Sequence, residues 1–496
     1  MTRACVIGAG IGGLALAIRL QSSGVETTLV EARDRVGGQA YGWDREGFSF
    51  DGGPASIGNP ASLVDLWQLS GHDMADDIEL LPIERFRRLA WIDGTTLDLS
   101  GDADALRREI ARIAPEDAAG YEEFLRWSAN ALQEGTARLL VSPPRDLSSA
   151  ARAVPVFLRY QAWRSAYGAV SRFVKSEKLR EAFTVQALMT GANPLTASVY
   201  HALGHKFELD RGVWWPKGGM NGLARAMARQ FERLGGTLLL HDPVLHIHTL
   251  GDRASEVECV SGWRQRFDAV ASSADAVHAY RDLLAGSMRG GEMARRLMRQ
   301  HSSPSCFSVY FGLEGSWPGI PHETVLFGPR YEGLLDDIFD HGVLPRDMLI
   351  FLLHPSVTDP SLAPPGKSTF RALISVANQS KLPIDWDQTG PLIEKRILDE
   401  VGRRLIPDLG DRIVTSFHYA PRDFALDLNA WAGSAYGLQK GLARRLWRRL
   451  PVRDVKIRNF YLAGADTQPG GGIPGAIAGA KAVARSMLAD LREGPP

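Results

Sequence analysis

The sequence is poor in cysteine. Its 496 residues include only Cys5, Cys259 and Cys306, which are widely separated and odd in number. Small secreted domains use several paired cysteines, and zinc sites need ligands at short, regular spacing. We therefore interpret the three cysteines as packing residues of a protein that stays in a reducing compartment.

The chain also lacks a long hydrophobic run and a net charge. Its longest uncharged apolar stretch lies between Arg3 and Arg19 and contains four glycines. That is shorter than the ~20 residues that cross a bilayer, and no substantial basic region precedes it as in a signal peptide. Basic and acidic residues balance at 57 each, so we expect no nucleic-acid partner. These absences favour a cytoplasmic protein and leave attachment to a membrane surface open.

Glycine, in contrast, gathers near the N-terminus. A strand-like run over 3–7 precedes Gly8, Gly10 and Gly13, which have the spacing G-x-G-x-x-G; a helical pattern and a second strand-like run ending at Glu31 follow. Such glycines permit a tight turn, close approach of a pyrophosphate and helix–strand packing, while the acid accepts hydrogen bonds from ribose hydroxyls. The pattern predicts a dinucleotide site and disfavours NADP. It does not decide between FAD and NAD.

Two further segments extend this prediction. Arg33, Arg35 and the pair Gly37 and Gly38 follow the second strand-like run, which suits a cofactor lying extended along the domain. Near the C-terminus, the run GADTQPGGGIPGAIAGAKA starts at Gly464 and combines six glycines and two prolines with one acid. So little side-chain volume predicts that a large, flat group lies against the backbone there.

Taken in order, these segments resemble the bacterial-type carotenoid (phytoene) desaturases of the flavin amine-oxidase superfamily. The similar motifs are VIGAGIGGLALAIRL, EARDRVGG, FDGGP, GVWWPKGGMNGLARAM and YLAGADTQPGGGIPGAIAGAKA. They follow one another in family order and, with the segments between them, cover essentially the whole chain. The resemblance implies a bound FAD and the desaturation of a carotenoid precursor, 15-cis-phytoene in the first place.

The resemblance also implies an α/β fold made of two parts. A Rossmann-like FAD-binding domain is expected to be discontinuous and to consist of residues 1–80, 210–285 and 455–491. The substrate domain, a mixture of sheet and helices, takes the rest of the chain. Residues 81–209 are expected to be helical and to face substrate and membrane, and residues 286–454 to supply the sheet and further helices.

Carried over residue by residue, the family motifs predict the cofactor-binding positions. The backbone at Val244 is implied to contact the adenine side, Asp466 to accept from a ribityl hydroxyl, and the helix beginning near Ile473 to direct its N-terminus at the flavin. The full set is Gly8, Gly10, Gly13, Glu31, Arg33, Gly37, Gly38, Gly53, Pro54, Val244, Gly464, Asp466, Gly472, Ile473 and Pro474.

Desaturation requires the removal of two hydrogens from adjacent carbons. No side chain is a two-electron oxidant, whereas an oxidised flavin accepts a hydride. A weak base or water suffices for the remaining proton, so we assign no catalytic residue. His246 and His248 lie on one face of a strand-like run but lack a third ligand, and no metal is expected.

A carotenoid or another polyisoprenoid substrate implies a membrane. Carrying a C40 chain through water costs about 20 kcal/mol or more, so the protein is expected to bind peripherally to the inner face of the membrane. Residues 153–173 and Lys440–Leu450 mix aromatic, aliphatic and basic residues as interfacial segments do. The electrons are expected to pass to a quinone or to oxygen.

Alternatives to phytoene desaturation stay open. The usual family sequence GGRA reads GGQA at Gly37–Ala40, and GSAF reads GSAY at 433–436. These changes keep a later or hydroxylated carotenoid open as the substrate. Another flavin oxidase of the same fold, such as an amine oxidase, and a flavin-free isoprenoid carrier are the remaining hypotheses.

Overall fold

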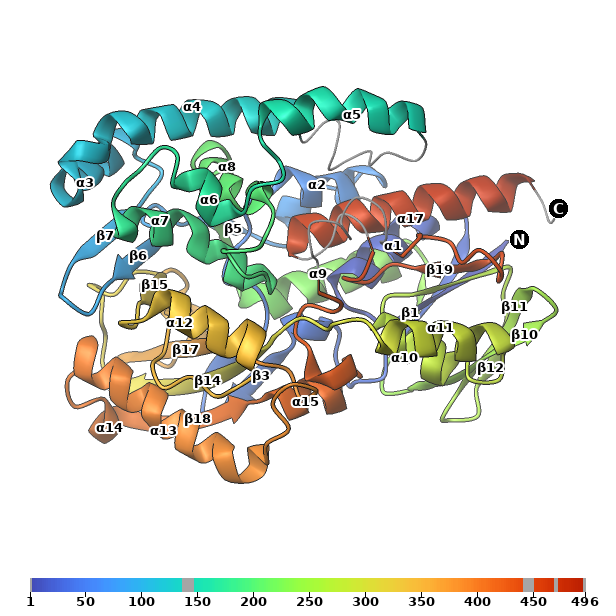
Figure 1. Ribbon diagram of the computed structural model, residues 1–496. Coiled ribbons are helices and arrows are strands. Elements are labelled where there is room, and N and C mark those ends of the chain that lie inside the picture. The colour runs from blue at the N-terminus through green and yellow to red at the C-terminus, as the bar shows by residue number, and fades with distance from the viewer. Residues whose placement is uncertain (1, 136–146, 440–449, 468–471, 494–496) are drawn as a thin grey trace.

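The computed structural model describes residues 2–135, 147–439, 450–467 and 472–493. Two large sheets, each with its own helices, and a separate layer of helices make up most of the molecule (Figure 1). The segment Lys440–Leu450, for which we predict a membrane contact, lies outside the described residues except at its last position.

A five-stranded parallel sheet forms the centre of the first part. Its strand order is β19-β13-β1-β2-β9, and every pairing is parallel. The strands are β1 (Arg3–Ile7), β2 (Glu26–Val30), β9 (Thr237–Leu239), β13 (Ala269–Ser272) and β19 (Phe460–Leu462). Because the sheet is covered on both faces, β1 is buried from Ala4 onward. Three distant stretches of chain thus build one sheet.

Helices α1 (Ile11–Ser22), α9 (Gly219–Arg233) and α17 (Ile473–Glu493) pack together against this sheet and share one core. Figure 1 shows α17 running beside α1. A second core joins the sheet to a three-stranded sheet and two helices. These are β10 (Val244–Leu250), β11 (Arg253–Cys259), β12 (Arg264–Arg266), α10 (Ala276–His278) and α11 (Met288–Met298). Helix α11 therefore packs with the first part, beyond the predicted limit at residue 285.

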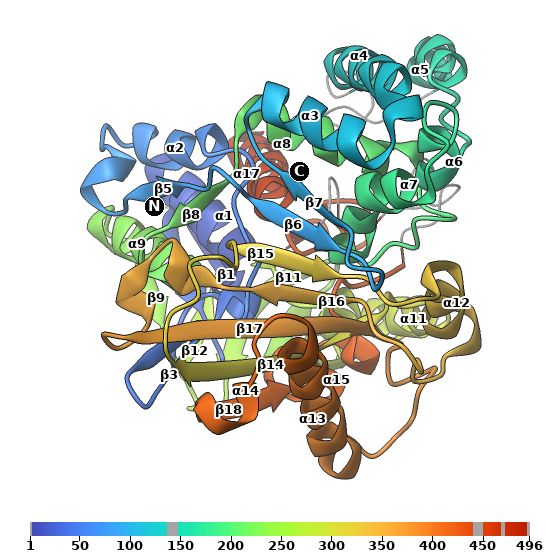
Figure 2. The ribbon, with the colours of Figure 1, turned by 90° about the vertical axis from the view of Figure 1, so that its left-hand side faces the viewer.

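A seven-stranded sheet forms the second part, in the order β18-β14-β17-β16-β15-β6-β7. The strands are β6 (Arg87–Ala90), β7 (Thr96–Leu99), β14 (Ser305–Glu314), β15 (Glu323–Leu326), β16 (Ile350–Leu353), β17 (Lys367–Val376) and β18 (Ile413–Tyr419). Helix α13 (Trp386–Arg404) packs on the outer face of the sheet. Figure 2 shows the sheet between α13 and the helical layer.

The helical layer covers the opposite, inner face of this sheet. It contains α3 (Ala103–Ile113), α4 (Ala118–Gly135), α5 (Leu147–Arg159), α6 (Ala166–Val170), α7 (Glu177–Thr184) and α8 (Gly204–Arg211). Helices take most of 81–209, but not its first twenty residues. There β6 and β7 form a hairpin that extends the seven-stranded sheet, and the burial of β7 alternates residue by residue as in a half-covered strand.

Shorter elements complete the fold. They are α2 (Ala61–Gln68), β3 (Gly42–Arg45), β4 (Phe48–Asp51), β5 (Leu80–Pro82), β8 (Trp214–Pro216), α12 (Tyr331–Asp336), α14 (Leu409–Arg412) and α15 (Pro421–Asp427). None of the helices in the described parts of the chain is long and apolar enough to cross a membrane.

Candidate functional site

The predicted glycines meet where three parallel strands end. The backbone N–H of Gly8 donates to Val30 O at 2.7 Å, and the N–H groups of Ser273 and Ala463 donate to the carbonyl groups of Ile7 and Ser272. The carboxyl ends of β1, β13 and β19 therefore lie side by side. Ligands of open α/β sheets bind outside this edge.

Gly13 makes the first close contact of the site. A Cβ atom at this position would lie 1.9 Å from the carbonyl oxygen of Gly8. Only glycine lets α1 approach β1 so closely. The helix begins after Gly10, and no side chain among the described residues caps its N-terminus. Its first N–H groups are thus available to a phosphate.

Gly37 and Gly38 pack against the first glycine turn, at Ala9 and Gly10. The N–H of Gly37 donates to Ala9 O at 2.8 Å, and Gly37 adopts a φ of +127°, which a side chain disfavours. A Cβ atom on Gly38 would lie 3.0 Å from Gly10 Cα. We call the positions Gly8, Gly10, Gly13, Gly37, Gly38 and Gly464 the glycine junction.

Glu31 lies directly beside the glycine junction. Its carboxylate accepts the N–H of Ala9 at 2.7 Å and that of Arg33 at 3.0 Å. Burial raises the pKa of Glu31, and the two backbone N–H donors oppose that rise. The carboxylate therefore holds the first glycine turn in place.

The loop before Val244 reaches the same corner. The N–H groups of His241 and Asp242 donate to the carbonyl oxygens of Arg33 and Glu31 at 2.8 and 3.1 Å. Val244 begins β10 directly after this loop, so the structure brings Val244 and Glu31 to one end of the site.

The side chain of Arg33 is engaged by protein groups. Its guanidinium lies 3.5 Å from the centroid of the Tyr41 ring and forms an ion pair with Asp427 at 3.2 Å. The backbone of Arg33, rather than this side chain, borders the corner formed by Glu31 and the loop before Val244.

The turn after β4 carries the predicted Gly53 and Pro54. Arg371, from the middle of β17, donates through Nη1 to Asp51 O at 3.1 Å and to Gly53 O at 2.5 Å. Its Nε is buried and has no hydrogen-bond partner among the described residues. A buried donor beside a backbone turn is suited to a bound polar ligand.

Asp51 and Asn221 fix the same region, and sequence reasoning missed both. Asp51 accepts the N–H groups of Met220 and Asn221, and Asn221 Nδ2 donates to Val36 O and Ala40 O at 3.0 Å each. They fall within the motifs FDGGP and GGMNG. Their place inside these two motifs was the only sequence signal that could have identified them as site residues.

We expect Asp51 to make stability depend on pH. Burial raises its pKa from 3.8 to about 6. Between pH 4 and 6 the folded protein then binds more protons at Asp51 than the unfolded chain does. The free energy of unfolding should fall as pH rises through this interval and level off above it, a change on the order of 2 to 3 kcal/mol from this group.

Denaturant unfolding at pH 4, 5, 6 and 7 measures this dependence. The variant Asp51→Asn has no carboxyl to titrate, so its stability should fall less over the same interval than that of the wild type. Identical pH profiles for the two proteins would show that Asp51 does not titrate in this range.

Asp466 lies at the carboxyl end of β19, two residues after Gly464. Its two carboxylate oxygens accept the N–H groups of Leu438 at 2.6 Å and Ala276 at 3.1 Å. Burial and the nearby charge of Asp466 raise the pKa of Asp275, which caps α10. Asp466 thus joins three segments of chain at the predicted flavin end of the site.

The helix α17 begins next to this acid. Gly472 has a φ of +78° and its carbonyl oxygen accepts the N–H of Ala476, while Ile473 is buried. Pro474 follows in the first turn, where proline is well tolerated. Residues 468–471 of the glycine run lie outside the described residues.

His246 and His248 of β10 contact other side chains of the protein. The rings of His246 and His248 lie 6.0 Å apart, and His248 Nε2 is 2.6 Å from Glu258 Oε2. Within the described part of the chain, no group of three or more His, Cys, Asp or Glu side chains is arranged to hold a metal ion.

These features fit a flavin dinucleotide. The glycine junction exposes backbone and the uncapped N-terminus of α1, as a pyrophosphate requires; Glu31 stands at the ribose position of a dinucleotide fold. The chain also matches the family model described as "Flavin containing amine oxidoreductase" over residues 11–488. It belongs to this family and is an FAD-dependent oxidoreductase.

Curated relatives define the family more narrowly. A lycopene-forming phytoene desaturase of Paracoccus sp. is 44% identical over 98% of this chain and 97% of its own length. That of Pseudescherichia vulneris is 43% identical over 99% and 100%, and a neurosporene-forming phytoene desaturase of Cereibacter sphaeroides is 34% identical over 97% and 94%. The chain belongs to the bacterial-type phytoene desaturase family, as its motifs predict.

Solved structures confirm the fold. An oxidoreductase from Methanosarcina mazei superimposes with a TM-score of 0.65 at 17% identity, covering 98% of this chain and 100% of that one. Putrescine oxidase with bound putrescine gives 0.63 at 16% identity, covering 99% of each chain. At such identities the likeness concerns the fold alone.

Proposed function

We propose that this protein is an FAD-dependent desaturase that introduces C=C bonds into a carotenoid precursor, 15-cis-phytoene, by hydride transfer. The observation that carries the proposal is the likeness to three curated phytoene desaturases over nearly the whole chain. The fold adds a second support, because the apolar inner face of the seven-stranded sheet lies next to the turn at Gly53.

Leu353 of β16 and Leu373 of β17 point to this inner face and share a core with Leu179 and Leu188 of the helical layer. Arg371 lies on the same face, two residues from Leu373, and reaches the turn at Gly53. A hydrocarbon held on this face would therefore lie near the cofactor site.

The residues of the chain position the reactants. FAD, when bound, supplies the two-electron oxidant. The glycine junction and Glu31 would hold its dinucleotide half, and Arg371 would keep the Gly53 turn in place beside it. The apolar inner face would orient the polyene and exclude water, which serves a step that depends on alignment of a C–H bond.

Two protic side chains on this face remain protonated. Cys306 Sγ and Tyr436 Oη lie 3.2 Å apart. Burial raises the pKa of Cys306 to about 11 and that of Tyr436 well above its ordinary value. Neither side chain is ready to act as a base at neutral pH, so we propose that the second proton leaves to water or another weak base.

We also propose that the protein binds the inner face of the membrane peripherally. Along α5 and the loop that follows it, Val154, Leu158 and Trp163 are 49%, 57% and 49% exposed. The exposed residues Arg159 and Arg164 lie among them. Apolar side chains with flanking cations suit the interface of an anionic bilayer.

Sedimentation with anionic phospholipid vesicles tests this contact. The double variant Leu158→Ser and Trp163→Ser should bind the vesicles at least tenfold more weakly than the wild type, because it loses most of the exposed apolar area. Leu250→Ser serves as control, since Leu250 is 78% exposed on the three-stranded sheet. Equal loss in the control, or none in the double variant, would contradict the proposed contact.

Glu31→Gln should weaken FAD binding. The substituted amide presents a donor to one of the two backbone N–H groups that the carboxylate now accepts, and it also loses an acceptor for the ribose. A buried unpaired donor costs about 1–3 kcal/mol, so we expect the dissociation constant for FAD to rise about tenfold or more. Titration of the apoprotein with FAD, followed by fluorescence, measures it. An unchanged constant would exclude Glu31 from the binding site.

The reaction itself is tested with purified holoprotein in vesicles that contain 15-cis-phytoene. Chromatography should show carotenoids with longer conjugation, and parallel arms with a quinone or with oxygen identify the electron acceptor. Further arms replace phytoene by a later or a hydroxylated carotenoid. If only a later or a hydroxylated carotenoid reacts, that carotenoid and not phytoene is the substrate. If neither phytoene nor any of these carotenoids reacts, the proposed function is contradicted.

A further inference from the structure

Arg371 is a buried cation that lacks a counter-charge in the part of the chain that the structure describes. It lies in the middle of β17, is only 5% exposed and forms no ion pair with a described residue. Its Nη1 donates to Asp51 O and Gly53 O, while the buried Nε has no hydrogen-bond partner among the described residues. Burying a charge is costly unless an opposite charge lies beside it, so we expect a ligand to supply one.

The acids around Arg371 have other partners. The charge of Arg371 reaches the carboxyl group of Asp51, but both oxygens of that group accept backbone N–H groups of α9. Glu323 of β15 points to the same face of the sheet two strands away, and it pairs with Arg87 at 3.0 Å. Neither acid is therefore free to serve as the counter-charge of Arg371.

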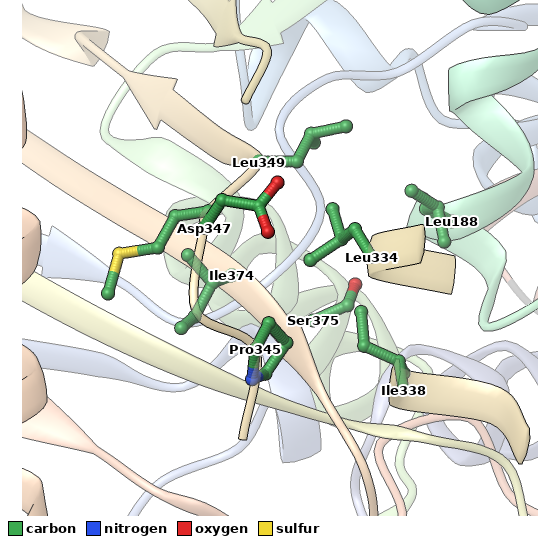
Figure 3. A pocket seen from close by; sticks show the side chains of 9 residues that line it. Leu188, Leu334, Ile338, Pro345, Asp347, Leu349, Ile374 and Ser375 are labelled. Carbon is green, nitrogen blue, oxygen red and sulfur yellow. The ribbon is translucent and has the colours of Figure 1, made fainter. Parts of the chain in front are cut away.

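The far end of β17 does not supply a counter-charge either. Figure 3 shows Leu334 of α12 beside Ser375, four residues beyond Arg371. The cavity between them has a volume of about 10 Å³, which is room for about one water. Asp347 lies in its wall and is paired with Arg330 at 2.6 Å. This end of the strand is closed to a ligand.

The other surroundings of Arg371 belong to the cofactor site. The turn that it binds packs directly on the loop of the glycine junction, because a Cβ atom on Gly53 would lie 3.0 Å from Ala40 Cα and Ala40 N donates to Gly37 O at 3.0 Å. Leu373 follows on the apolar inner face, where we place the substrate. The pyrophosphate is expected at the N-terminus of α1. The part of FAD that meets the inner face is then the flavin ring.

We infer that the guanidinium of Arg371 faces the flavin ring and stabilises the negative charge that the ring acquires on reduction. The inference rests on the proposed function. Hydride transfer carries two electrons and one proton from a substrate C–H bond to a neutral ring, which then bears one negative charge. The carbon chain is left as a cation and loses a proton to water. A cation fixed beside the ring in a water-poor site favours this transfer.

The reduction potential of the bound FAD tests this inference. Arg371→Gln keeps an N–H donor for Gly53 O but removes the charge. We expect its preference for reduced over oxidised FAD to fall at least tenfold, which lowers the potential by about 30 mV or more. Arg371→Lys keeps a charge and should retain at least half of that difference. Redox titration of the purified holoproteins with dithionite and a reference dye measures the potentials.

Arg404→Gln is the matched control. Arg404 of α13 also donates to two backbone carbonyl oxygens, at 2.8 and 2.9 Å, but it comes from the helix on the outer face of the sheet. Its variant should keep the wild-type potential. An unchanged potential in FAD-loaded Arg371→Gln, or an equal fall in the control, would overturn the inference while the desaturase function stands. A holoprotein that desaturates no carotenoid would overturn the proposed function itself.

Two further measurements make the assignment specific. ADP carries the pyrophosphate without the flavin ring, so its dissociation constant from the apoprotein should be the same for Arg371→Gln and the wild type. A rise of about tenfold in that constant, with an unchanged potential, would assign Arg371 to the pyrophosphate and overturn the inference. The wild type needs no variant: its bound FAD should have a higher potential than free FAD, and a lower one would contradict the role of Arg371.

Discussion

Replacing Gly13 by alanine should give a colourless protein. The added Cβ would lie 1.9 Å from Gly8 O, far inside contact distance. Relief requires α1 to move away from β1, which removes the N-terminus of α1 from the pyrophosphate position. We expect the FAD-to-protein ratio after purification to fall at least tenfold and the thermal unfolding temperature to fall with it.

Gly101→Ala is the control for this experiment. A Cβ atom at Gly101 would meet no described heavy atom within 4 Å, and Gly101 does not adopt a positive φ. Flavin absorbance and release of flavin by heat measure cofactor content in both variants. Full FAD content in Gly13→Ala would mean that the first glycine turn does not form the cofactor site.

Replacing Arg87 by methionine should strongly destabilise the fold. Arg87 of β6 forms buried ion pairs with Glu208 of α8 at 3.1 Å and with Glu323 of β15 at 3.0 Å. The variant leaves two carboxylates buried without their cation. Removing one partner of a buried ion pair costs about 3–5 kcal/mol. Because Glu208 belongs to the helical layer, the layer should loosen from the sheet first.

Arg88→Met provides the matched control. Arg88 is the next residue on β6, points to the opposite face and pairs with Asp98 at a partly exposed position. Its loss should cost about 1 kcal/mol or less. Denaturant unfolding gives the two free energies, and proteolysis between α3 and α8 reports on the layer. Similar stabilities for the two variants would show that the buried pairs contribute little.

Local patterns predicted much of the fold. The pattern around Gly8, Gly10 and Gly13 predicted β1, α1 and β2. The hairpin of β6 and β7 was not identified, since short strands that complete a distant sheet carry little periodic signal of their own.

The candidate site could be predicted where the backbone conformation of a short segment requires glycine. It could not be predicted where a contact joins side chains and backbone that are far apart in the sequence. Gly13 and Gly37 are required by contacts within a short stretch of sequence, so a motif reveals them. Arg371 binds the carbonyl group of a residue 318 positions earlier. A single arginine inside a strand gives no hint of such a contact.

The strand order of the parallel sheet has a consequence for biosynthesis. Strand β19 and helix α17 come from the last part of the chain, yet β19 pairs with β13, which in turn pairs with β1. Until β19 and α17 have been synthesised, one edge of β13 and the side of α1 that α17 covers have no partner. The site is therefore incomplete until β19, Asp466 and α17 have been synthesised, and we expect FAD to bind only after that point.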